Sequence, residues 1–567
     1  MIWEEIEKPD KKNVVDLMSA INVSRPIAEL LVQRDILDYD AAKAFFRPNL
    51  DNLHDPFLMK DMKKAVERIE EALESGEKIL IYGDYDVDGT TSVALVYSYF
   101  KDMNADCLAY VPDRYKEGYG LSFQGIDHAE KKNVSLVICL DCGIKAMDKV
   151  EYAASKNIDI IICDHHRPGS KIPKAVAVLD PKQDDCNYPY KELCGCGIGF
   201  KLIHALHKNN NRPFEELLPY LDLVVTAIGS DIVPITGENR ILAYHGLKIL
   251  NDNPRPGFKA LMSMVKKDDF NITDVVFIIG PRINAAGRME HGLEAVNLLI
   301  EKDQNTANEK AKAIEAYNLD RRTTDQNITL EALKQIKSLK EEKTKTTVVY
   351  NESWHKGVIG IVASRLTETY YRPTLVFTKS GDYLAASARS VLGFDIYNAL
   401  EASSEYIEQF GGHKYAAGLT IKEENYSRFR KKFEEVVSDQ IEDHQLVQKQ
   451  IYDSEIKLND ITPKFFRILK QFGPFGPKNM NPVFRINALQ DTGFAKAVGK
   501  ENEHLKCKLF KNEESLKIDG IGFNLGHKID LLKNKQKVDV ICAIDENFWN
   551  GQISLQLKIK DLKLHSA

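Results

Sequence analysis

The 567-residue chain lacks the features that mark membrane and secreted proteins. It contains no stretch of about 18 or more uncharged apolar residues, so we expect no membrane span. Its first ten residues are acidic and lack the apolar core of a signal peptide, which favours a cytoplasmic protein. It also shows no internal repeat and no low-complexity segment. The length predicts about two to four globular domains.

The cysteines do not show the spacing of a zinc site. Among nine cysteines, Cys194 and Cys196 lie in a Cys-Gly-Cys-Gly run that has no matching second pair. Cys139, Cys142 and Cys163 lie in or beside strand-like runs, and we expect them to be small buried groups. The net charge of −6 argues against a generally basic nucleic-acid coat. It leaves room for a local basic groove, because bound metal ions would offset several acids.

The most informative stretch, residues 82–92, reads Tyr-Gly-Asp-Tyr-Asp-Val-Asp-Gly-Thr-Thr-Ser. An apolar run precedes it and an amphipathic run follows, which predicts a strand, a tight loop and a helix. Asp84, Asp86 and Asp88 alternate along the loop and can converge on one point. Close carboxylates repel one another unless a cation lies among them, and hard divalent cations prefer oxygen ligands. The alternative is a solvated acidic turn, in which Asp and Gly are common.

Short apolar runs alternate with helical segments over the next hundred residues. This pattern predicts a parallel sheet covered on both faces, and in such sheets sites form at the carboxyl ends of the strands. Strands are expected at 78–82, 107–111, 135–140, 159–163 and 175–179, with helices at 61–75, 92–102, 123–132 and 145–156.

Acids and imidazoles occur at those strand ends. Asp84 to Asp88 follow the first strand, Asp141 ends the third, and Asp164-His165-His166 ends the fourth. Asp231 ends a separate apolar segment, residues 221–230. A lone His pair is usually a surface feature, but four such segments at one rim predict a single site.

The predicted site has the composition of a manganese or magnesium centre. Four carboxylates would be neutralised by two divalent cations, and imidazoles add neutral nitrogen ligands. Two such ions about 3.5–4 Å apart are the usual device for phosphoester hydrolysis. We expect Asp141 to bridge the ions and Asp164 to orient an imidazole from behind, with Asp84 also in a supporting position. The expected catalytic residues are Asp86, Asp88, Asp141, His165, His166 and Asp231.

A phosphodiester also needs cations from the protein. Two segments place arginine beside small or hydroxyl residues, a pattern that suits phosphate binding. For each arginine the alternative is a structural salt bridge, and His413 in a Gly-Gly-His loop could instead cap a turn. The candidates are Arg282, Asn284 and Arg288 in residues 280–288, and Ser387, Arg389 and Ser390 in residues 387–390.

The rest of the chain divides by pattern. Residues 301–343 have helical spacing without Gly or Pro, which predicts one long helix joining two lobes; the alternative is a pair of surface helices on the first lobe. A second α/β unit follows, with strands near 347–350, 374–378 and 383–387, and then a charged helix at 427–448. The predicted divisions are 1–55 (helical segment), 56–300 (catalytic domain), 301–343 (connecting helix), 344–426 (second lobe), 427–449 (linker helix) and 450–567 (barrel).

The last part reads as a small barrel of the oligonucleotide-binding type. Its runs are short, β-branched and separated by turns, and Asn550-Gly551 is a hairpin signal. Such barrels hold single strands through basic and aromatic side chains. Several of the candidates in this chain must instead belong to the core of the barrel. The candidates are Phe472, Phe475, Lys478, Phe484, Arg485, Phe523 and Trp549.

Taken in order, these motifs resemble the DHH (Asp-His-His) phosphoesterase superfamily, and most closely the RecJ-type single-strand-specific 5′-to-3′ DNA exonucleases. The similarity runs from about residue 40 to 420, with a weaker match at Pro474-Phe-Gly. One local departure is the run from Pro474 to Pro482, where the family often has a shorter Gly-Asn-Pro ending. The matching segments are 82–92, 111–122, Asp141-Cys-Gly, Asp164-His165-His166, Ser230-Asp231-Ile-Val-Pro, 280–289, 387–390 and Gly411-Gly-His413.

The resemblance implies two α/β lobes, a catalytic one and a DHH-associated one, that flank a groove, with an oligonucleotide-binding barrel beside them. It implies Asp86, Asp141 and Asp231 on one metal ion, and Asp88, Asp141 and His165 on the other. It implies a metal-dependent 5′-to-3′ exonuclease of single-stranded DNA, a metal-activated water, a role in repair and recombination, and partnership with a single-strand-binding protein and a helicase. We expect a monomer. The expected strand-holding residues are Arg114, Tyr115, Arg282, Asn284, Arg288, Ser387, Arg389, Ser390 and His413.

Two alternatives stay open at this point. A small-substrate member of the superfamily would cleave short oligonucleotides, cyclic dinucleotides or pyrophosphate, and a chain-length series of substrates would identify it. A non-enzymatic binding module would have lost the metals, and metal analysis would identify it. The complete ligand set argues against the second, and the extra barrel argues against the first.

Overall fold

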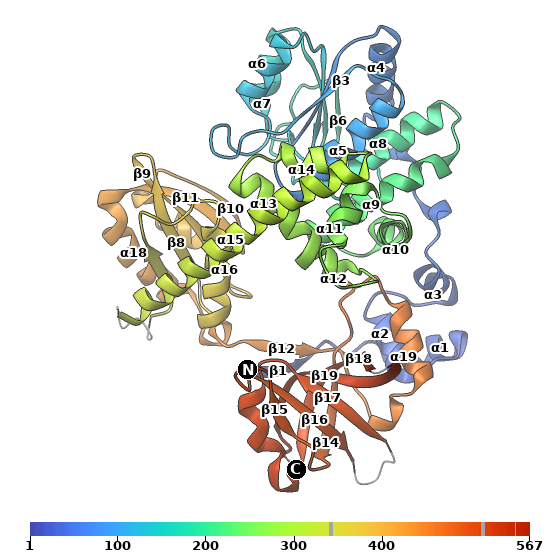
Figure 1. Ribbon diagram of the computed structural model, residues 1–567, viewed down its shortest axis with the longest axis vertical. Helices are drawn as coiled ribbons and strands as arrows, with labels where there is room; N and C mark the ends of the chain where they lie inside the picture. The colour runs from blue at the N-terminus through green and yellow to red at the C-terminus, as the bar shows by residue number, and fades with distance from the viewer. Residues whose placement is uncertain (339–343, 512–515, 550, 567) are drawn as a thin grey trace.

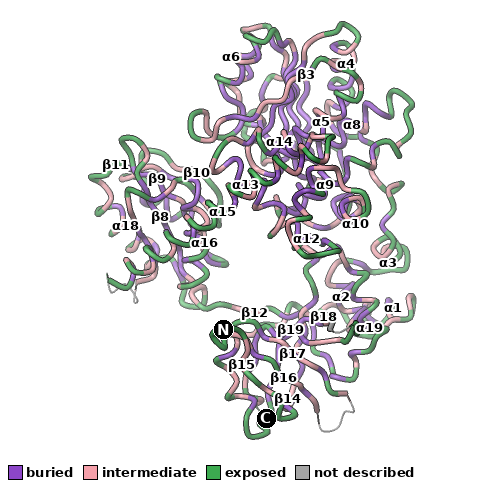
Figure 2. Tube along the Cα trace, in the orientation of Figure 1, coloured by how far each residue is buried: buried purple, intermediate pink, exposed green. Residues whose placement is uncertain are grey.

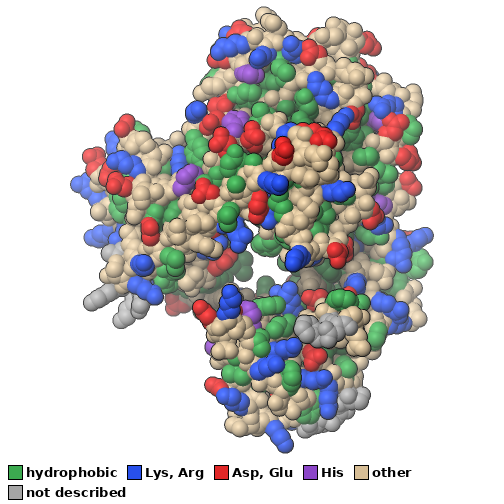
Figure 3. All heavy atoms as spheres, in the orientation of Figure 1, with side chains coloured by type: hydrophobic (Ala, Val, Ile, Leu, Met, Phe, Trp, Pro, Cys, Tyr) green, Lys and Arg blue, Asp and Glu red, His purple; other side chains and the backbone are tan. Residues whose placement is uncertain are grey.

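The computed structural model describes residues 1–338, 344–511, 516–549 and 551–566. They form three bodies around a central opening that Figures 1 and 3 both show. The first lobe lies at the top of Figure 1, the second lobe at its left, and a β-rich body with both chain ends at the bottom. We call the bottom part, residues 1–48 and 449–566, the terminal body. None of the described helices is both long and apolar enough to cross a bilayer.

The first lobe contains the predicted parallel sheet, with strand order β3-β2-β4-β5-β6. Ile79 and Ile81 face one core cluster while Leu80 and Tyr82 face another, so both faces of the sheet are covered. Figure 2 shows most of these strands buried, with the edge strand β3 partly exposed. The strands are β2 (Ile79–Gly83), β3 (Cys107–Tyr110), β4 (Leu136–Leu140), β5 (Asp159–Cys163) and β6 (Ala177–Leu179). Helices α4 (Met62–Glu74), α5 (Val87–Asp102) and α8 (Gly195–Asn209) cover one face, and α6 (Phe123–Lys131) and α7 (Met147–Ser155) cover the other.

Helix α5 begins five residues earlier than predicted. Asp86 is its N-cap and accepts a hydrogen bond from Gly89 N at 3.0 Å, so Asp88 lies in the first helical turn and not in a loop. The hydroxyls of Thr91 and Ser92 bond to carbonyls four residues back, which lets polar residues lie in a buried helix. Because these residues are polar, the sequence did not predict the first turn of this helix.

Further helices complete the first lobe and lead out of it. The single helix α15 (Gln304–Ser338) agrees with the helix predicted over 301–343, of which residues 339–343 lie outside the described part of the chain. Its Ala307 and Ala311 belong to the first-lobe core, whereas Ala332 and Ile336 pack in a core cluster of the second lobe. One helix is thus shared by two cores. The others are η3 (Phe214–Tyr220), α9 (Leu221–Ser230), α10 (Gly237–Asp252), α11 (Pro256–Met262), α12 (Ile272–Asp274), the π-helical η4 (Val275–Ile279), α13 (Gly280–Met289) and α14 (Leu293–Leu299).

The second lobe is a sheet of order β10-β11-β9-β8-β7, in which only β7 and β8 are parallel. The prediction of a loop at Gly411-Gly-His413 was wrong, because these residues form an edge strand paired with β11. The charged helix ends at Gln440, earlier than predicted. The elements are β7 (Thr347–Tyr350), α16 (Ile359–Tyr370), β8 (Thr374–Ser380), β9 (Tyr383–Arg389), α17 (Ile396–Glu401), β10 (Gln409–His413), β11 (Ala416–Lys422) and α18 (Tyr426–Gln440).

The terminal body contains the predicted β-rich module. Pairings of β14 with β18, β18 with β19, β19 with β17, β17 with β16 and β16 with β14 form a ring. The expected turn at Asn550-Gly551 includes a residue outside the described part of the chain. The elements are β13 (Ser454–Glu455), α19 (Pro463–Gln471), β14 (Phe484–Asp491), β15 (Lys496–Val498), β16 (His504–Phe510), β17 (Lys517–Gly522), η10 (Gly526–Lys535), β18 (Val538–Trp549) and β19 (Gln552–Leu564).

The N-terminal residues are part of this body, which the sequence did not predict. Helices α1 (Lys11–Ile21), α2 (Arg25–Val32) and α3 (Tyr39–Phe46) share one core cluster with α19 and the ring of strands. Strand β1 (Ile2–Glu5) pairs in parallel with β12 (Lys449–Tyr452), on the segment that leaves the second lobe. The module after residue 450 therefore shares its core with residues more than 400 positions away.

Candidate metal centre

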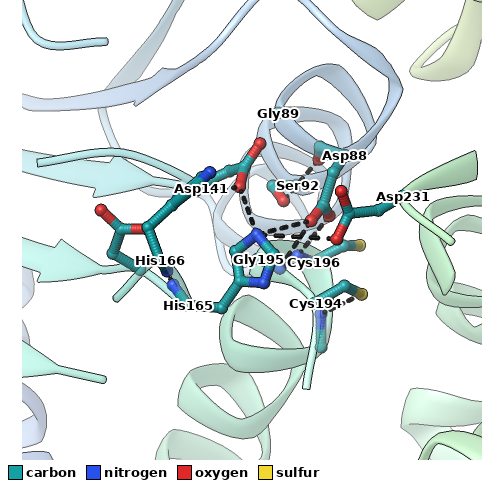
Figure 4. A network of polar contacts seen from close by, with 12 residues as sticks. Asp88, Gly89, Ser92, Asp141, His165, His166, Cys194, Gly195, Cys196 and Asp231 are labelled. Carbon is teal, nitrogen blue, oxygen red and sulfur yellow. Dashed lines mark hydrogen bonds and ion pairs between the residues drawn. The ribbon is translucent and has the colours of Figure 1, made fainter. Parts of the chain in front are cut away.

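The acids gather where the sheet strands end, as predicted. Asp141 follows β4, the central strand, and its backbone has a positive φ of 59°, a conformation that Asp tolerates better than most residues. Asp164 and His165 follow the neighbouring strand β5. Asp231 comes from the end of α9 and Asp88 from the start of α5. Figure 4 shows that the side chains of Asp88, Asp141, His165 and Asp231 point toward one another.

His165 lies at the centre of the group. Its Nε2 is 3.1 Å from Asp141 Oδ1, 3.6 Å from Asp231 Oδ2 and 3.8 Å from Asp88 Oδ2. Asp88, His165 and Asp231 form one set of ligand atoms that all lie within 4.8 Å, and Asp141, His165 and His166 form another. The two sets overlap at His165. An imidazole nitrogen has one lone pair and can bind one ion, so a ligand shared by two ions has to be a carboxylate.

Asp88 is held by the amino end of helix α8. Gly195 N and Cys196 N donate to its two oxygens at 2.6 and 2.7 Å. Backbone N–H groups at a helix start favour an anion. Gly195 is required there, because a Cβ would lie 2.6 Å from the Cβ of Asp141. The Cys-Gly-Cys-Gly run thus anchors a carboxylate, a role that the sequence analysis missed.

The acids carry more negative charge than the protein neutralises. Burial, followed by the charge of Asp86, raises the pKa of Asp88 to about 7 and that of Asp84 to about 8. Burial and Asp88 raise the pKa of Asp231 to about 8, and burial raises that of Asp141 well above its usual range. Oδ1 of Asp141 and Oδ2 of Asp84 are buried and accept no hydrogen bond. Hard divalent cations fit this oxygen-rich set with one neutral imidazole.

The two histidines differ in charge. Burial and the neighbouring His166 lower the pKa of His165 to about 3, so its imidazole is neutral and can be a ligand. Burial opposes a charge on His166 as well, but a 2.7 Å bond from its Nδ1 to Asp164 Oδ1 raises its pKa to about 8. Asp164 also accepts from the backbone N–H groups of His165 and Ile144. Asp164 therefore orients His166, as a supporting residue.

Two predicted residues lie beside these ligand sets, and one acid was overlooked. Asp86 caps α5 and acts on the group through its charge, so its role as a ligand stays a prediction. Asp84 accepts from Gly120 N at 3.3 Å. Asp180 follows β6 at the same rim, is fully buried, and has a pKa raised to about 7 by burial. The run Leu179-Asp180-Pro181 offered the same strand-end signal and could have been found.

We expect manganese to stabilise the folded protein. An ion that binds the native acids and not the unfolded chain adds about 2.7 kcal/mol at a concentration one hundredfold above its Kd. After chelation, added Mn²⁺ should raise the Tm by several degrees, as measured by differential scanning fluorimetry. Asp88→Asn should remove most of this shift, and a shift of equal size in that variant would contradict the assignment.

Arginines from both lobes gather around Arg288, and Arg114 and Arg288 lie near Tyr85 in the acidic segment. Arg288 on α13 donates to Gly357 O of the second lobe at 2.9 Å. Burial, followed by the charges of Arg114, Arg321 and Arg389, lowers the pKa of Arg288 to about 10. Arg321, on α15, belongs to no motif, so only the folded chain could reveal it. Cations placed so near one another suit a polyanion.

The other predicted strand-holding residues divide into two groups. Tyr115 OH donates to Arg288 O at 2.6 Å. The guanidinium carbon of Arg114 lies 4.6 Å from the ring centre of Tyr85, the residue between Asp84 and Asp86 in the sequence. Arg389 Nη1 donates to Ser387 Oγ at 3.1 Å. These residues join the arginine group. Arg282 instead pairs with Glu315 at 2.6 Å, Ser390 bonds to Phe394 O, Asn284 is half-buried on α13, and His413 is exposed on β10.

Comparisons with known proteins agree with this arrangement. The chain matches models of the DHH family N-terminal domain over residues 78–228, the DHHA1 domain over 343–439 and the RecJ OB domain over 452–561. It is 34% identical to the single-stranded-DNA-specific exonuclease RecJ of Bacillus subtilis, over 99% of this chain and 70% of that protein. It is 32% identical to RecJ of Escherichia coli, over 89% and 90%. The crystal structure of RecJ in complex with Mn²⁺ from Thermus thermophilus superposes with a TM-score of 0.86 at 26% identity, covering all of this chain and 80% of that one.

Proposed function

The chain belongs to the RecJ family of single-stranded-DNA-specific exonucleases, and from this premise we propose that it removes nucleotides from the 5′ end of single-stranded DNA in repair and recombination. The observation that carries the proposal is the convergence of Asp88, Asp141, Asp231 and His165 at one rim, next to arginines from both lobes. A related structure contains Mn²⁺ and another contains Mg²⁺. We further propose that two such ions bind.

Each residue then has a definite task. Asp88, Asp141, Asp231 and His165 would hold the ions, with Asp86 as a fifth ligand and Asp141 between them. When bound, the ions would supply an activated water and charge stabilisation at the phosphoryl oxygens. Gly195 and Cys196 keep Asp88 in place through their N–H groups. Asp164 holds His166 through its Nδ1, and the other ring nitrogen, Nε2, lies 3.0 Å from the hydroxyl of Tyr119, so a proton held at Nε2 can be shared with that hydroxyl.

We propose that Arg288 and Arg389 hold phosphates of the strand. Each charge-assisted contact contributes roughly 1.5–3 kcal/mol. Arg288→Gln and Arg389→Gln should each weaken DNA binding by that amount and reduce the salt slope by about 0.7, with normal metal content. Fluorescence anisotropy over a salt series measures both quantities. Arg282→Gln is the matched control, because its ion pair with Glu315 predicts an unchanged slope. Unchanged affinity in the first two variants would make them structural residues.

We propose that the strands of the terminal body bind the single strand beside the groove. Lys496, Lys506, Ile521 and Lys558 are register partners across β15, β16, β17 and β19, so they form one row on one face. Phe523 follows β17 with 54% of its surface exposed. Basic and aromatic groups on such a face suit a single strand. Of the predicted aromatic candidates, Phe472 and Phe484 are core, and the side chain of Trp549 lies outside the described part.

Further proposals follow from the resemblance. A single-strand-binding protein and a helicase would supply the substrate, and the enzyme would work as a monomer in the cytoplasm. Nine buried free cysteines are compatible with a reducing compartment. Sedimentation of the protein alone tests whether it is a monomer. The same measurement with a single-strand-binding protein added tests whether the two proteins bind each other.

A further inference from the structure

A loop after α19 joins the terminal body to the segment that carries Asp231. We call residues 472–480 the joint loop; it lies where the terminal body reaches the first lobe in Figure 1. Ile235 N, four residues after Asp231, donates to Pro477 O at 2.8 Å. A Cβ at Gly476 would lie 2.5 Å from the side chain of Ile235, so only glycine permits this approach. The joint loop therefore packs directly against the backbone that follows a predicted metal ligand.

The joint loop is closed by a buried side chain of its own. Asn479 is 1% exposed, and its Nδ2 donates to Phe472 O at 2.8 Å and to Pro474 O at 2.9 Å. Its Oδ1 accepts from Nε of Arg34, in the turn that follows α2, at 2.8 Å. The loop is thus a defined structure, held on one side by the N-terminal helices.

Arg240 on α10 fastens this loop to the first lobe. The side chain is 5% exposed, and its guanidinium carbon lies 3.8 Å over the ring of Phe45. Its nitrogens donate to backbone carbonyls at the end of α3, at the end of α19 and in the joint loop itself. The acceptors are Phe45 O (3.0 Å), Gln471 O (3.2 Å), Phe472 O (2.8 Å), Gly473 O (2.9 Å) and Pro474 O (3.4 Å).

This arginine has an unusual environment. In the part of the chain that the structure describes, no carboxylate pairs with it, and burial, followed by the charge of Arg34, lowers its pKa to about 9. Burying a cation is costly unless its donors are satisfied, and the carbonyls at the end of α19 supply the negative end of a helix dipole. These acceptors converge only when the first lobe, α3 and α19 are docked. A lysine could not replace the planar set of five donors.

We propose that Arg240 is a positioning residue that fixes the terminal body against the Asp231 segment and so keeps a strand bound by that body aligned with the metal centre. This inference rests on the proposed strand-binding role of the terminal body. The bond between Ile235 and Pro477 transmits the alignment, since it joins the Asp231 segment to the joint loop. Long strands, which reach both sites, need this alignment, whereas a trinucleotide reaches only the metal centre.

The test compares full-length Arg240→Gln with the unsubstituted protein on two substrates. The KM for a strand of several tens of nucleotides should rise about tenfold, because a terminal body that is less firmly docked misplaces the strand relative to the metal centre. The kcat on a trinucleotide should stay within about twofold, and small-angle X-ray scattering should show an expanded molecule. Arg240→Lys keeps the charge and should give an intermediate KM; it also serves if the Gln variant does not fold. Arg47→Gln is the matched control, because this exposed arginine donates to Phe46 O and to the side chain of Gln471, both within the terminal body.

The outcomes separate this inference from the function on which it rests. Unchanged scattering in Arg240→Gln would overturn it, and so would equal losses on the trinucleotide and the long strand. If scattering shows that Arg240→Gln is expanded while its KM for long strands is unchanged, Arg240 fixes the terminal body as proposed. The strand-binding role of the terminal body would then be contradicted. An expanded Arg240→Gln protein whose KM rises for long strands while its turnover of the trinucleotide is kept supports both proposals.

Discussion

Asp141→Asn should reduce hydrolysis of single-stranded DNA on the order of 10³-fold or more while the protein stays folded. The side chain follows the central strand, its Oδ1 is buried without a hydrogen bond, and it faces His165 at 3.1 Å. Asn has nearly the same shape and tolerates the positive φ of 59°, whereas Ala would add backbone strain. Turnover of an end-labelled strand in Mn²⁺, beside a thermal melt, measures the effect.

The control for this variant is Asp180→Asn. Asp180 is a buried acid at the same rim but lies in neither set of converging ligand atoms. We expect a loss of about tenfold to one hundredfold at most, as for residues behind a metal ligand. Substantial turnover by folded Asp141→Asn would contradict the proposal that this residue lies between two ions. Equal losses in both variants would show that any acid at the rim matters through charge alone.

Removing the terminal body should spare the chemistry and weaken binding of long strands by about 10²-fold, because two linked sites bind with avidity. The structure determines how to cut the chain. Ending it near residue 445 would expose the apolar faces of α1, α2 and α3, which pack against α19 and the strands. Residues 1–48 must therefore be removed as well, which leaves a chain of residues 49–445.

Two readouts test this shortened chain. Anisotropy gives its affinity for a strand of several tens of nucleotides, and product lengths in the presence of competitor DNA give the number of cuts per binding event. We expect weak binding, short runs and normal kcat on a trinucleotide. If the folded fragment matches the full-length affinity and run length, the terminal body is not a strand-binding module, and a protein-docking role becomes the better explanation.

The parts predicted from the sequence were those with a local or periodic signal. Apolar runs such as residues 160–163 predicted buried parallel strands, and the rule that sites form at strand ends then brought Asp141 and His165 together. Asp231 joins them from the end of helix α9. The glycine-free stretch ending near Ser338 predicted one helix. In each case the neighbouring residues alone specify the local structure, so the sequence contains the needed information.

The parts that were missed depend on partners far along the chain. The core that α1 shares with the ring of strands, the arginine group that includes Arg321, and the carbonyls around Arg240 all join segments separated by many residues. The early start of α5 was missed because Thr91 and Ser92 satisfy their hydroxyls within the helix, so polarity misleads. Gly411 and Gly412 indicated a loop, yet pairing with β11 extends them into a strand.

The central claim is that a metal-dependent site in the first lobe degrades single-stranded DNA from its 5′ end. The most direct measurement is a time course with one oligonucleotide labelled at either the 5′ or the 3′ end, in Mn²⁺ and after chelation, with the matching duplex and a cyclic dinucleotide as competing substrates. We predict that the 5′ label appears at once as a mononucleotide, that the 3′-labelled strand shortens step by step, and that chelation stops both. Early release of the 3′ label, or cleavage of only the cyclic dinucleotide, would contradict the claim.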